Sequence, residues 1–199
     1  MGQLIAAAQR ATELGLDFQH VATPYQGGAT RTPEFLALNP LGQVPVLVDA
    51  GQVLCDSNGI LVYLVQRYAP GSAWLPQDAV GQAQLQRWLS LAAGFLAPGI
   101  GGPRFATLTG RAVNEVAQAT GKRLLAFMED ELQGRAWLLG GSAPSLADVA
   151  MVSYTSQAHL AGLPLDAYPR IAAWVARMQA LPGYPVLADQ LPAAEQVAA

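Results

Sequence analysis

The spacing of apolar positions along the chain changes near residue 70. Before it, apolar side chains alternate over short runs or stand singly between Gly- and Pro-rich stretches, a spacing typical of strands. After residue 78 they recur every three or four positions, as on amphipathic helices. The pattern therefore predicts a mixed α/β domain over residues 1–70, a linker over 71–77 (GSAWLPQ) and an all-helical domain over 78–199.

Local signals divide the first domain further. Gly15 suits the position after a helix, and Leu16 can fold back on that helix. Asn39-Pro40 stops a short helical turn, because the residue before a proline avoids helical geometry. In chain order the pattern predicts a helix over 3–14, a strand over 17–22, a helical turn over 34–38, a strand over 44–48, a tight turn at 49–51, its hairpin partner over 52–55 and a helix from 56 to 68.

Four apolar stripes define the helices of the second domain, and each is expected to face the core. The stripes are Leu85, Trp88, Leu89, Ala92, Phe95 and Leu96; Val113, Val116, Thr120, Leu124, Phe127 and Met128; Leu146, Val149, Ala150, Ser153 and Tyr154; and Ile171, Trp174, Val175 and Met178.

Charge is scarce. Hydrophobic residues make up 52% of the 199 residues and charged residues 13%, with a net charge of −3. A disordered chain is excluded, since such chains are poor in apolar residues. One lysine, Lys122, and a slightly acidic balance argue against nucleic-acid binding. The neutral surface favours an oligomer interface.

Cysteine and histidine exclude two further classes of site. Cys55 is the one cysteine, so no internal disulfide forms and a reducing, cytoplasmic location is expected. Because Cys55 ends a short strand, we expect it to be buried. His20 and His159 stand far apart and predict no metal site. No apolar run is long enough for a membrane span, and the N-terminus lacks the basic start of a secretory signal.

Three motifs carry a family resemblance. They are TPEFLALNPLGQVPVL (residues 32–47), CDSNGILVYL (55–64) and PSLADVA (144–150), followed by YPRIAAWVARM (168–178). In this order and spacing, over nearly the whole chain, they resemble the cytosolic glutathione transferase superfamily. The resemblance implies a thioredoxin-like first domain, an all-helical second domain, a homodimer and glutathione as a substrate, with no metal.

The resemblance implies that the Val44–Pro45 bond is cis and that Val44 offers its backbone to glutathione. Glutathione is a tripeptide, so its cysteinyl backbone can pair with Val44 as an added strand would. The alternative is an ordinary proline at the start of a strand. Gln43 matches a family position near the tripeptide backbone or its glycyl end.

Asp56 and Ser57 stand at a predicted helix N-terminus, where free N–H groups and the helix dipole attract an anion. The resemblance implies that Ser57 holds the γ-glutamyl carboxylate and Asp56 the γ-glutamyl ammonium, although the family usually has Glu at the latter position. A plain helix cap is the other interpretation, and the two are compatible.

Two further sets of residues match family positions. Ser145 and Asp148 have the spacing of a capping box, which we interpret as structural. Phe95, Arg104 and Phe105 lie where the family's helical domain faces the electrophile, although such residues are more often core.

The family's first strand and catalytic turn have no match here. The stretch ELGLDF (residues 13–18) corresponds to the end of the family's first helix, so about one strand and one turn, about eleven residues, are expected in front. No Ser, Tyr or Cys precedes Thr12, and no catalytic residue can be assigned. Either the chain begins further upstream, or its first domain has rearranged or borrows a strand.

The leading hypothesis is a glutathione transferase that conjugates glutathione to a small hydrophobic electrophile. A non-catalytic glutathione-binding or interaction protein of the same fold is the main competitor. A glutathione-dependent thiol-transfer or isomerase activity is a third hypothesis.

Overall fold

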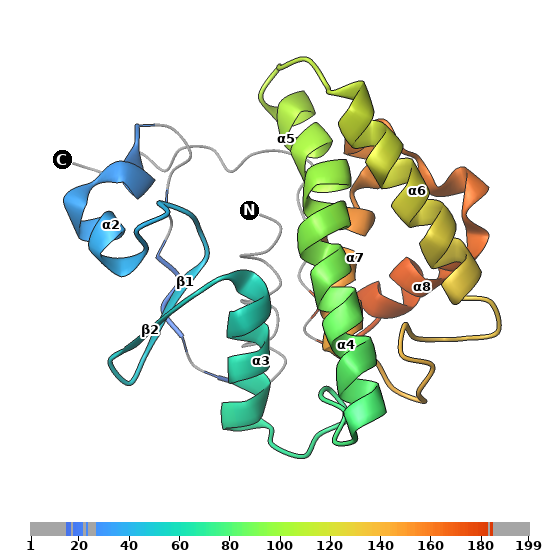
Figure 1. Ribbon diagram of the computed structural model, residues 1–199, viewed down its shortest axis with the longest axis horizontal. Coiled ribbons are helices and arrows are strands. Elements are labelled where there is room, and N and C mark those ends of the chain that lie inside the picture. Colours follow the sequence, from blue (N-terminus) through green and yellow to red (C-terminus); the bar gives the residue numbers. More distant parts are fainter. Residues whose placement is uncertain (1–14, 17, 22, 24–26, 183, 185–199) are drawn as a thin grey trace.

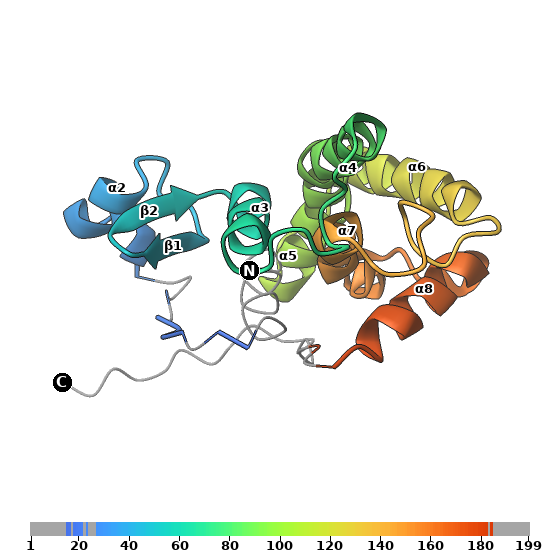
Figure 2. The same cartoon turned by 90° about the horizontal axis from the view of Figure 1, so that it is seen from below.

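The computed structural model describes residues 15–16, 18–21, 23, 27–182 and 184. Two lobes lie side by side (Figures 1 and 2). The smaller contains a β-hairpin and short helices, and the larger contains helices alone among its described elements. The expected combination of a thioredoxin-like domain with a helical domain is confirmed.

The small lobe is built around one hairpin. The 3-10 turn η1 (Ala29–Arg31) and helix α2 (Pro33–Leu38) lead to β1 (Val46–Asp49) and β2 (Gln52–Cys55), followed by helix α3 (Ser57–Tyr68). The two strands are antiparallel, with Val46 opposite Cys55 and Asp49 opposite Gln52. The predicted turn at 49–51 and the predicted helix ending at residue 68 are confirmed.

The predicted strand over residues 17–22 is wrong for its described residues 18–21, which form no strand. Phe18 and Val21 are exposed, so neither face of the alternating stretch is buried in the way a strand of the sheet would be. Gly15 has the expected left-handed conformation, with a φ of 67°, and Leu16 packs near Ile60 and Leu64. The predicted helix over 3–14 lies outside the described residues.

The large lobe begins with three helical segments that follow one another without a break. They are α4 (Ala79–Leu91), the π-helical segment η2 (Ala92–Gly101) and α5 (Gly102–Leu108). Gly99 of η2 crosses the backbone of helix α6 (Glu115–Glu131) so closely that a Cβ on Gly99 would lie 2.6 Å from the nitrogen of Gly121. The crossing explains why glycine stands at both positions.

The remaining helices close the main core around this long segment. They are α6 (Glu115–Glu131), α7 (Leu146–Thr155), η3 (Ala158–Ala161), η4 (Leu165–Ala167) and α8 (Pro169–Gln179). Three of the predicted stripes are largely buried, including all four members on α8. The stripe on α6 begins too early, since Val116 is 77% exposed in the first turn of the helix. No described helix is both long and apolar enough to cross a membrane.

Helix α3 belongs to both lobes. Ile60 and Leu64 pack against Leu47 and Leu54 of the hairpin, while Leu61 and Val65 are part of the main core of the large lobe. The far end of the helix is tied to the hairpin turn, because the hydroxyls of Tyr63 and Tyr68 both donate to Asp49 Oδ2, at 2.8 and 2.6 Å.

Candidate functional site

The hairpin register brings two separate motifs to one place. Val46, the first residue of β1, lies opposite Cys55, the last residue of β2. The chain before Val46 and the chain after Cys55 therefore leave the hairpin at the same end. Val44 precedes this pair by two residues and Ser57 follows it by two, so the predicted glutathione-binding residues gather at this end of the hairpin. They are Gln43, Val44, Pro45, Asp56 and Ser57.

Val44 offers an open backbone edge. The Val44–Pro45 peptide bond is cis, with Pro45 buried and Val44 half-buried. Among the described residues, neither the N–H nor the C=O of Val44 has a hydrogen-bond partner. A half-buried donor and acceptor on one residue suit pairing with an extended peptide.

Asp56 caps the helix that follows from a strained backbone position. Its φ is 70°, in the left-handed region that most residues avoid. One carboxylate oxygen, Oδ1, accepts the N–H groups of Asn58 and Gly59 at 2.9 and 3.0 Å. No described residue pairs with the second oxygen, and the side chain is exposed. The carboxylate can therefore cap α3 and still receive a cation.

Ser57 is the first residue of α3 and is only 2% exposed. Its Oγ has no hydrogen-bond partner among the described residues. Buried hydroxyls are nearly always hydrogen-bonded, because leaving one unpaired is costly. The hydroxyl stands at the N-terminus of a 12-residue helix, the end whose dipole attracts an anion. The hydroxyl is therefore available to donate to an acidic group placed at this helix end.

Asn58 links this end of the hairpin to the large lobe, a role that sequence reasoning missed. Its Nδ2 donates to the carbonyl of Leu89 on α4, at 3.0 Å. Leu89 lies just before η2 begins. No local pattern signals a contact between residues 31 positions apart.

The proposed second-substrate residues lie on two consecutive segments of the large lobe, η2 and α5. Phe95 of η2 lies beneath the guanidinium of Arg123, 5.7 Å from its ring centre, and Arg123 belongs to α6. That helix lies on the far side of the long helical segment from the hairpin (Figure 1). Arg104 of α5 is buried, at 3% exposure, and Phe105 lies beneath Arg111 at 5.9 Å. Their role toward an electrophile stays a prediction.

At the start of α7 the capping box is fully closed. Asp148 is completely buried, and its Oδ2 accepts the N–H and the Oγ–H of Ser145 at 2.8 and 2.9 Å. Its Oδ1 accepts the N–H of Leu138 and Nε1–H of Trp174, both at 2.9 Å. This carboxylate joins three segments of the large lobe and has no free edge for a ligand.

Cys55 is exposed, so the expectation that it is buried was wrong. Its partner Val46 and the pair Val48–Val53 share the face of the hairpin that points away from α3, and both valines of that pair are exposed. The Sγ makes one weak hydrogen bond, to the carbonyl of Leu38 at 3.5 Å. The described residues contain no group of three or more potential metal ligands.

Comparison with known proteins decides the family. Residues 11–67 match the model of the glutathione S-transferase N-terminal domain, and residues 82–177 match that of the C-terminal domain. The chain belongs to the glutathione S-transferase family. It is thus a transferase by family resemblance.

Relatives of this transferase carry more than one activity name. It is 35% identical to the maleylacetoacetate isomerase of Pseudomonas aeruginosa, over 79% of this chain and 77% of the relative. It is 28% identical to human glutathione S-transferase theta-2, over 78% and 68% of the two chains. A crystal structure of a glutathione S-transferase from Pseudomonas fluorescens superimposes with a TM-score of 0.86 at 32% identity, covering 93% of each chain.

Proposed function

We propose that this chain is a glutathione transferase that joins glutathione to a small hydrophobic electrophile. The unpartnered, buried hydroxyl of Ser57 at the start of α3 is the observation that carries the proposal. The free backbone edge of Val44, at the same end of the hairpin, supports it. The proposed location is the cytoplasm, where a reducing environment keeps the exposed Cys55 thiol free.

Each part of glutathione has a chemically suitable partner at this site. The γ-glutamyl carboxylate accepts hydrogen bonds from the Ser57 N–H and Oγ–H, favoured by the helix dipole. The γ-glutamyl ammonium pairs with the carboxylate oxygen of Asp56 that does not cap α3. The cysteinyl N–H and C=O pair with the backbone of Val44 beside Pro45, and Gln43 lies toward the glycyl end.

Anchoring at both sides of the cysteine fixes the position of its sulfur. A free thiol has a pKa of about 8.5 and is mostly protonated at neutral pH. Loss of the proton gives the thiolate, which is the nucleophile. With an aryl halide, a carbon–sulfur bond forms, the carbon–halogen bond breaks and halide leaves. The protein contributes by holding the thiol near an electrophile excluded from water.

Two measurements on the purified protein test the proposal. Isothermal titration calorimetry should detect glutathione binding, and an activated aryl halide should be converted to its glutathione conjugate. Binding without conjugation would instead support the non-catalytic glutathione-binding protein. Absence of binding would reject the site as well as the activity.

A glutathione-dependent isomerase is a second candidate, favoured by the 35% identity to the maleylacetoacetate isomerase. The same site would serve, because a thiolate that adds to a conjugated double bond allows rotation and is then expelled. Glutathione is regenerated in this reaction and consumed in conjugation. Incubation with maleylacetoacetate and substoichiometric glutathione separates the two: repeated turnover to the isomerised product indicates an isomerase.

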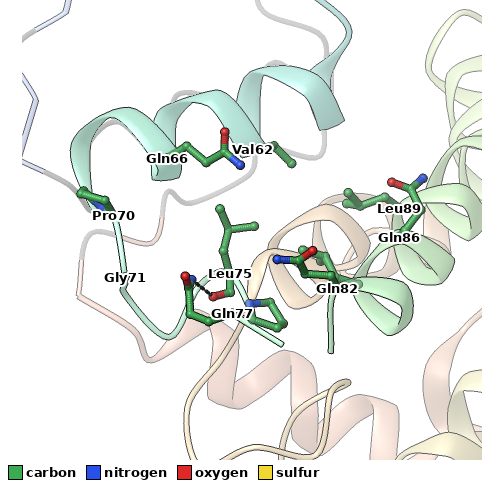
Figure 3. A pocket seen from close by; sticks show the side chains of 11 residues that line it. Val62, Gln66, Pro70, Gly71, Leu75, Gln77, Gln82, Gln86 and Leu89 are labelled. Atoms are coloured by element: carbon green, nitrogen blue, oxygen red, sulfur yellow. Dashed lines mark hydrogen bonds between the residues drawn. The ribbon is translucent and has the colours of Figure 1, made fainter. Parts of the chain in front are cut away.

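The proposal includes a homodimer, supported by a groove between the two lobes (Figure 3). Its volume is about 320 Å³, and its apolar floor includes Val62 of α3 and Leu85 and Leu89 of α4. Glutamine side chains such as Gln66 and Gln86 line it, and none of the described residues that line it is charged. Because no charge must be desolvated, this surface suits a second copy of the chain.

Size-exclusion chromatography with light scattering tests the dimer directly. The expected mass is about twice the 20.9 kDa of the chain. Leu85 supports the main core, so the test variant is Gln86→Glu, which adds one charge per copy to the groove. Gln133→Glu, in the exposed turn that follows α6, is the control. A dimer that dissociates equally in both variants would contradict this placement.

A further inference from the structure

The segment between α2 and β1 is held by one buried side chain, that of Asn39. Only 5% of this residue is exposed. Its Nδ2 donates to the carbonyl of Gln43 at 2.7 Å, and its Oδ1 accepts the N–H of Leu41 at 3.1 Å. Its backbone N–H and C=O bond to Phe35 and Gly42, at 2.9 and 2.8 Å. Asn39 thus connects the end of α2 to the residues just before the cis bond.

The surrounding residues leave this segment little freedom. Gly42 is buried with a φ of 61°, and a Cβ there would lie 2.8 Å from the carbonyl oxygen of Thr30 and 2.7 Å from Nη1 of Arg31. The same Arg31 nitrogen donates to the carbonyl of Leu41 at 3.3 Å. A side chain at residue 42 would therefore displace the whole turn.

The bond from Asn39 to Gln43 has a directional consequence. The carbonyl of Gln43 and the N–H of Val44 belong to one planar peptide unit, and in a trans unit they point in opposite directions. The cis bond lies one peptide later, between Val44 and Pro45. By holding the carbonyl toward α2, Asn39 turns the Val44 N–H away from the loop. That N–H has no partner among the described residues.

We propose that Asn39 is a positioning residue of the glutathione site. By fixing the Gln43 carbonyl, it aims the Val44 N–H at the cysteinyl carbonyl of bound glutathione. This inference rests on the proposed function. It adds a residue that touches no ligand yet sets the direction of a donor that does.

The experiment compares two ligands on two proteins. The ligands are glutathione and an isostere in which an (E)-alkene replaces the Cys–Gly amide, which removes the cysteinyl carbonyl together with the glycyl N–H. The wild-type protein should bind the isostere about tenfold more weakly, as expected for one lost hydrogen bond. The variant Asn39→Ala should bind glutathione about tenfold more weakly than wild type but distinguish the two ligands by less than about twofold.

Asn114→Ala is the matched control. Asn114 caps α6, where its Oδ1 accepts the Ala117 N–H at 3.0 Å, so its loss removes a side-chain-to-backbone bond far from the hairpin. It should leave the tenfold preference for glutathione intact. If Asn39→Ala does not fold, Gly42→Ala displaces the same turn and should also abolish the preference.

The outcomes separate this inference from the proposed function. A wild-type protein that binds neither ligand would reject both. A wild-type protein that prefers glutathione, together with an Asn39→Ala variant that keeps the full tenfold preference, would reject the role of Asn39 alone. The backbone amide chemical shift of Val44 should also change in Asn39→Ala, and not in Asn114→Ala, even without ligand.

Discussion

Helices α3 and α7 both have a serine and an aspartate at the N-terminus, but these residues are hydrogen-bonded differently in the two helices. At α7, the buried Asp148 carboxylate accepts four hydrogen bonds. At α3, Asp56 uses one oxygen as a cap, and the buried hydroxyl of Ser57 has no partner among the described residues. The same residue types thus close one helix end and leave the other open.

The difference separates a stabilising role from a binding role. Each hydrogen bond at α7 is made within the protein and contributes to folding. The Ser57 hydroxyl at α3 is buried without a hydrogen bond, which lowers the stability of the fold. The left-handed backbone of Asp56 lowers it as well. Such a cost is common at ligand sites, where the ligand supplies the missing bond.

The largest expected effect is on stability, when the hydrogen-bonded N-terminus of α7 loses Asp148. Asp148→Ala removes the acceptor of four buried donors, and we expect the free energy of unfolding to fall by about 3–5 kcal/mol. Urea denaturation measures this, with Asp130→Ala on the exposed side of α6 as control, expected within about 0.5 kcal/mol. A loss below about 1 kcal/mol would mean that the hydrogen bonds of Asp148 do not stabilise the fold.

Ser57→Ala should have the opposite profile. We expect glutathione affinity to fall about 10- to 100-fold, because a charge-assisted hydrogen bond is lost. Stability should be unchanged or higher, since the hydroxyl has no partner to lose. Calorimetric titration and denaturation measure the two effects.

Ser153→Ala provides the matched control for that variant. The Oγ of Ser153 is also buried and unpartnered among the described residues, but it lies within α7. Its removal should likewise leave stability unchanged or raise it, with no effect on glutathione affinity. Equal affinities in both serine variants would place the carboxylate site elsewhere.

The variant Asp56→Asn tests the negative charge at the N-terminus of α3. Asparagine keeps the cap and tolerates a positive φ, so stability should change by less than about 0.5 kcal/mol. Glutathione affinity should fall about two- to fivefold, as expected for an exposed ion pair. The wild-type affinity should weaken with added salt more steeply than that of the variant, and parallel salt dependences would rule out the ammonium contact.

The smallest effect concerns Asp49 of β1, which accepts hydrogen bonds from two tyrosines of α3. Hydrogen bonds from Tyr68 and then Tyr63 lower the pKa of this carboxyl below its ordinary value of 3.8. A lowered pKa in the folded state means that the stabilisation is present above pH 4 and is lost as the pH falls through the folded pKa. Thermal melts should therefore show a wild-type advantage over Asp49→Asn that shrinks below about pH 4.

The same contacts predict the alkaline limit. Hydrogen bonding to Asp49 raises the pKa of both tyrosines above 10.0, so their contribution is lost as the pH rises through those values. An advantage over Asp49→Asn that persists unchanged at both extremes would contradict the assigned contacts.

Local signals in the sequence predicted most of the described elements. The turn at 49–51, the helix beginning at Ser57 and the stripe on α8 follow from neighbouring residues alone. The strand over 17–22 failed over residues 18–21, because alternation shows only that a strand could form, whereas a strand also needs a hydrogen-bonded neighbour. The boundary between the domains at residues 71–77 stays a prediction.

The sequence predicted which residues make up the candidate site, but not the hydrogen bonds that connect them to the rest of the fold. The motifs named Val44, Asp56 and Ser57, because a cis-proline loop and a helix N-terminus have recognisable sequences. They did not reveal the hydrogen bond from Asn58 to Leu89 or the hydrogen bond from Asn39 to Gln43. The second depends on the backbone path of one turn, and the first depends on where segments 31 positions apart meet, which no single stretch of sequence encodes. The exposure of Cys55 was missed for the same reason, since it depends on what covers each face of the hairpin.

Helix α3 couples the stability of one lobe to that of the other. Its Leu61 and Val65 complete the core of the helical lobe, and its Ile60 and Leu64 complete that of the hairpin. Because melting this helix would open both cores at once, we expect the two lobes to unfold together in a single transition. A cut in the linker would not release two independent domains, because the helical fragment would expose the apolar surface that α3 covers.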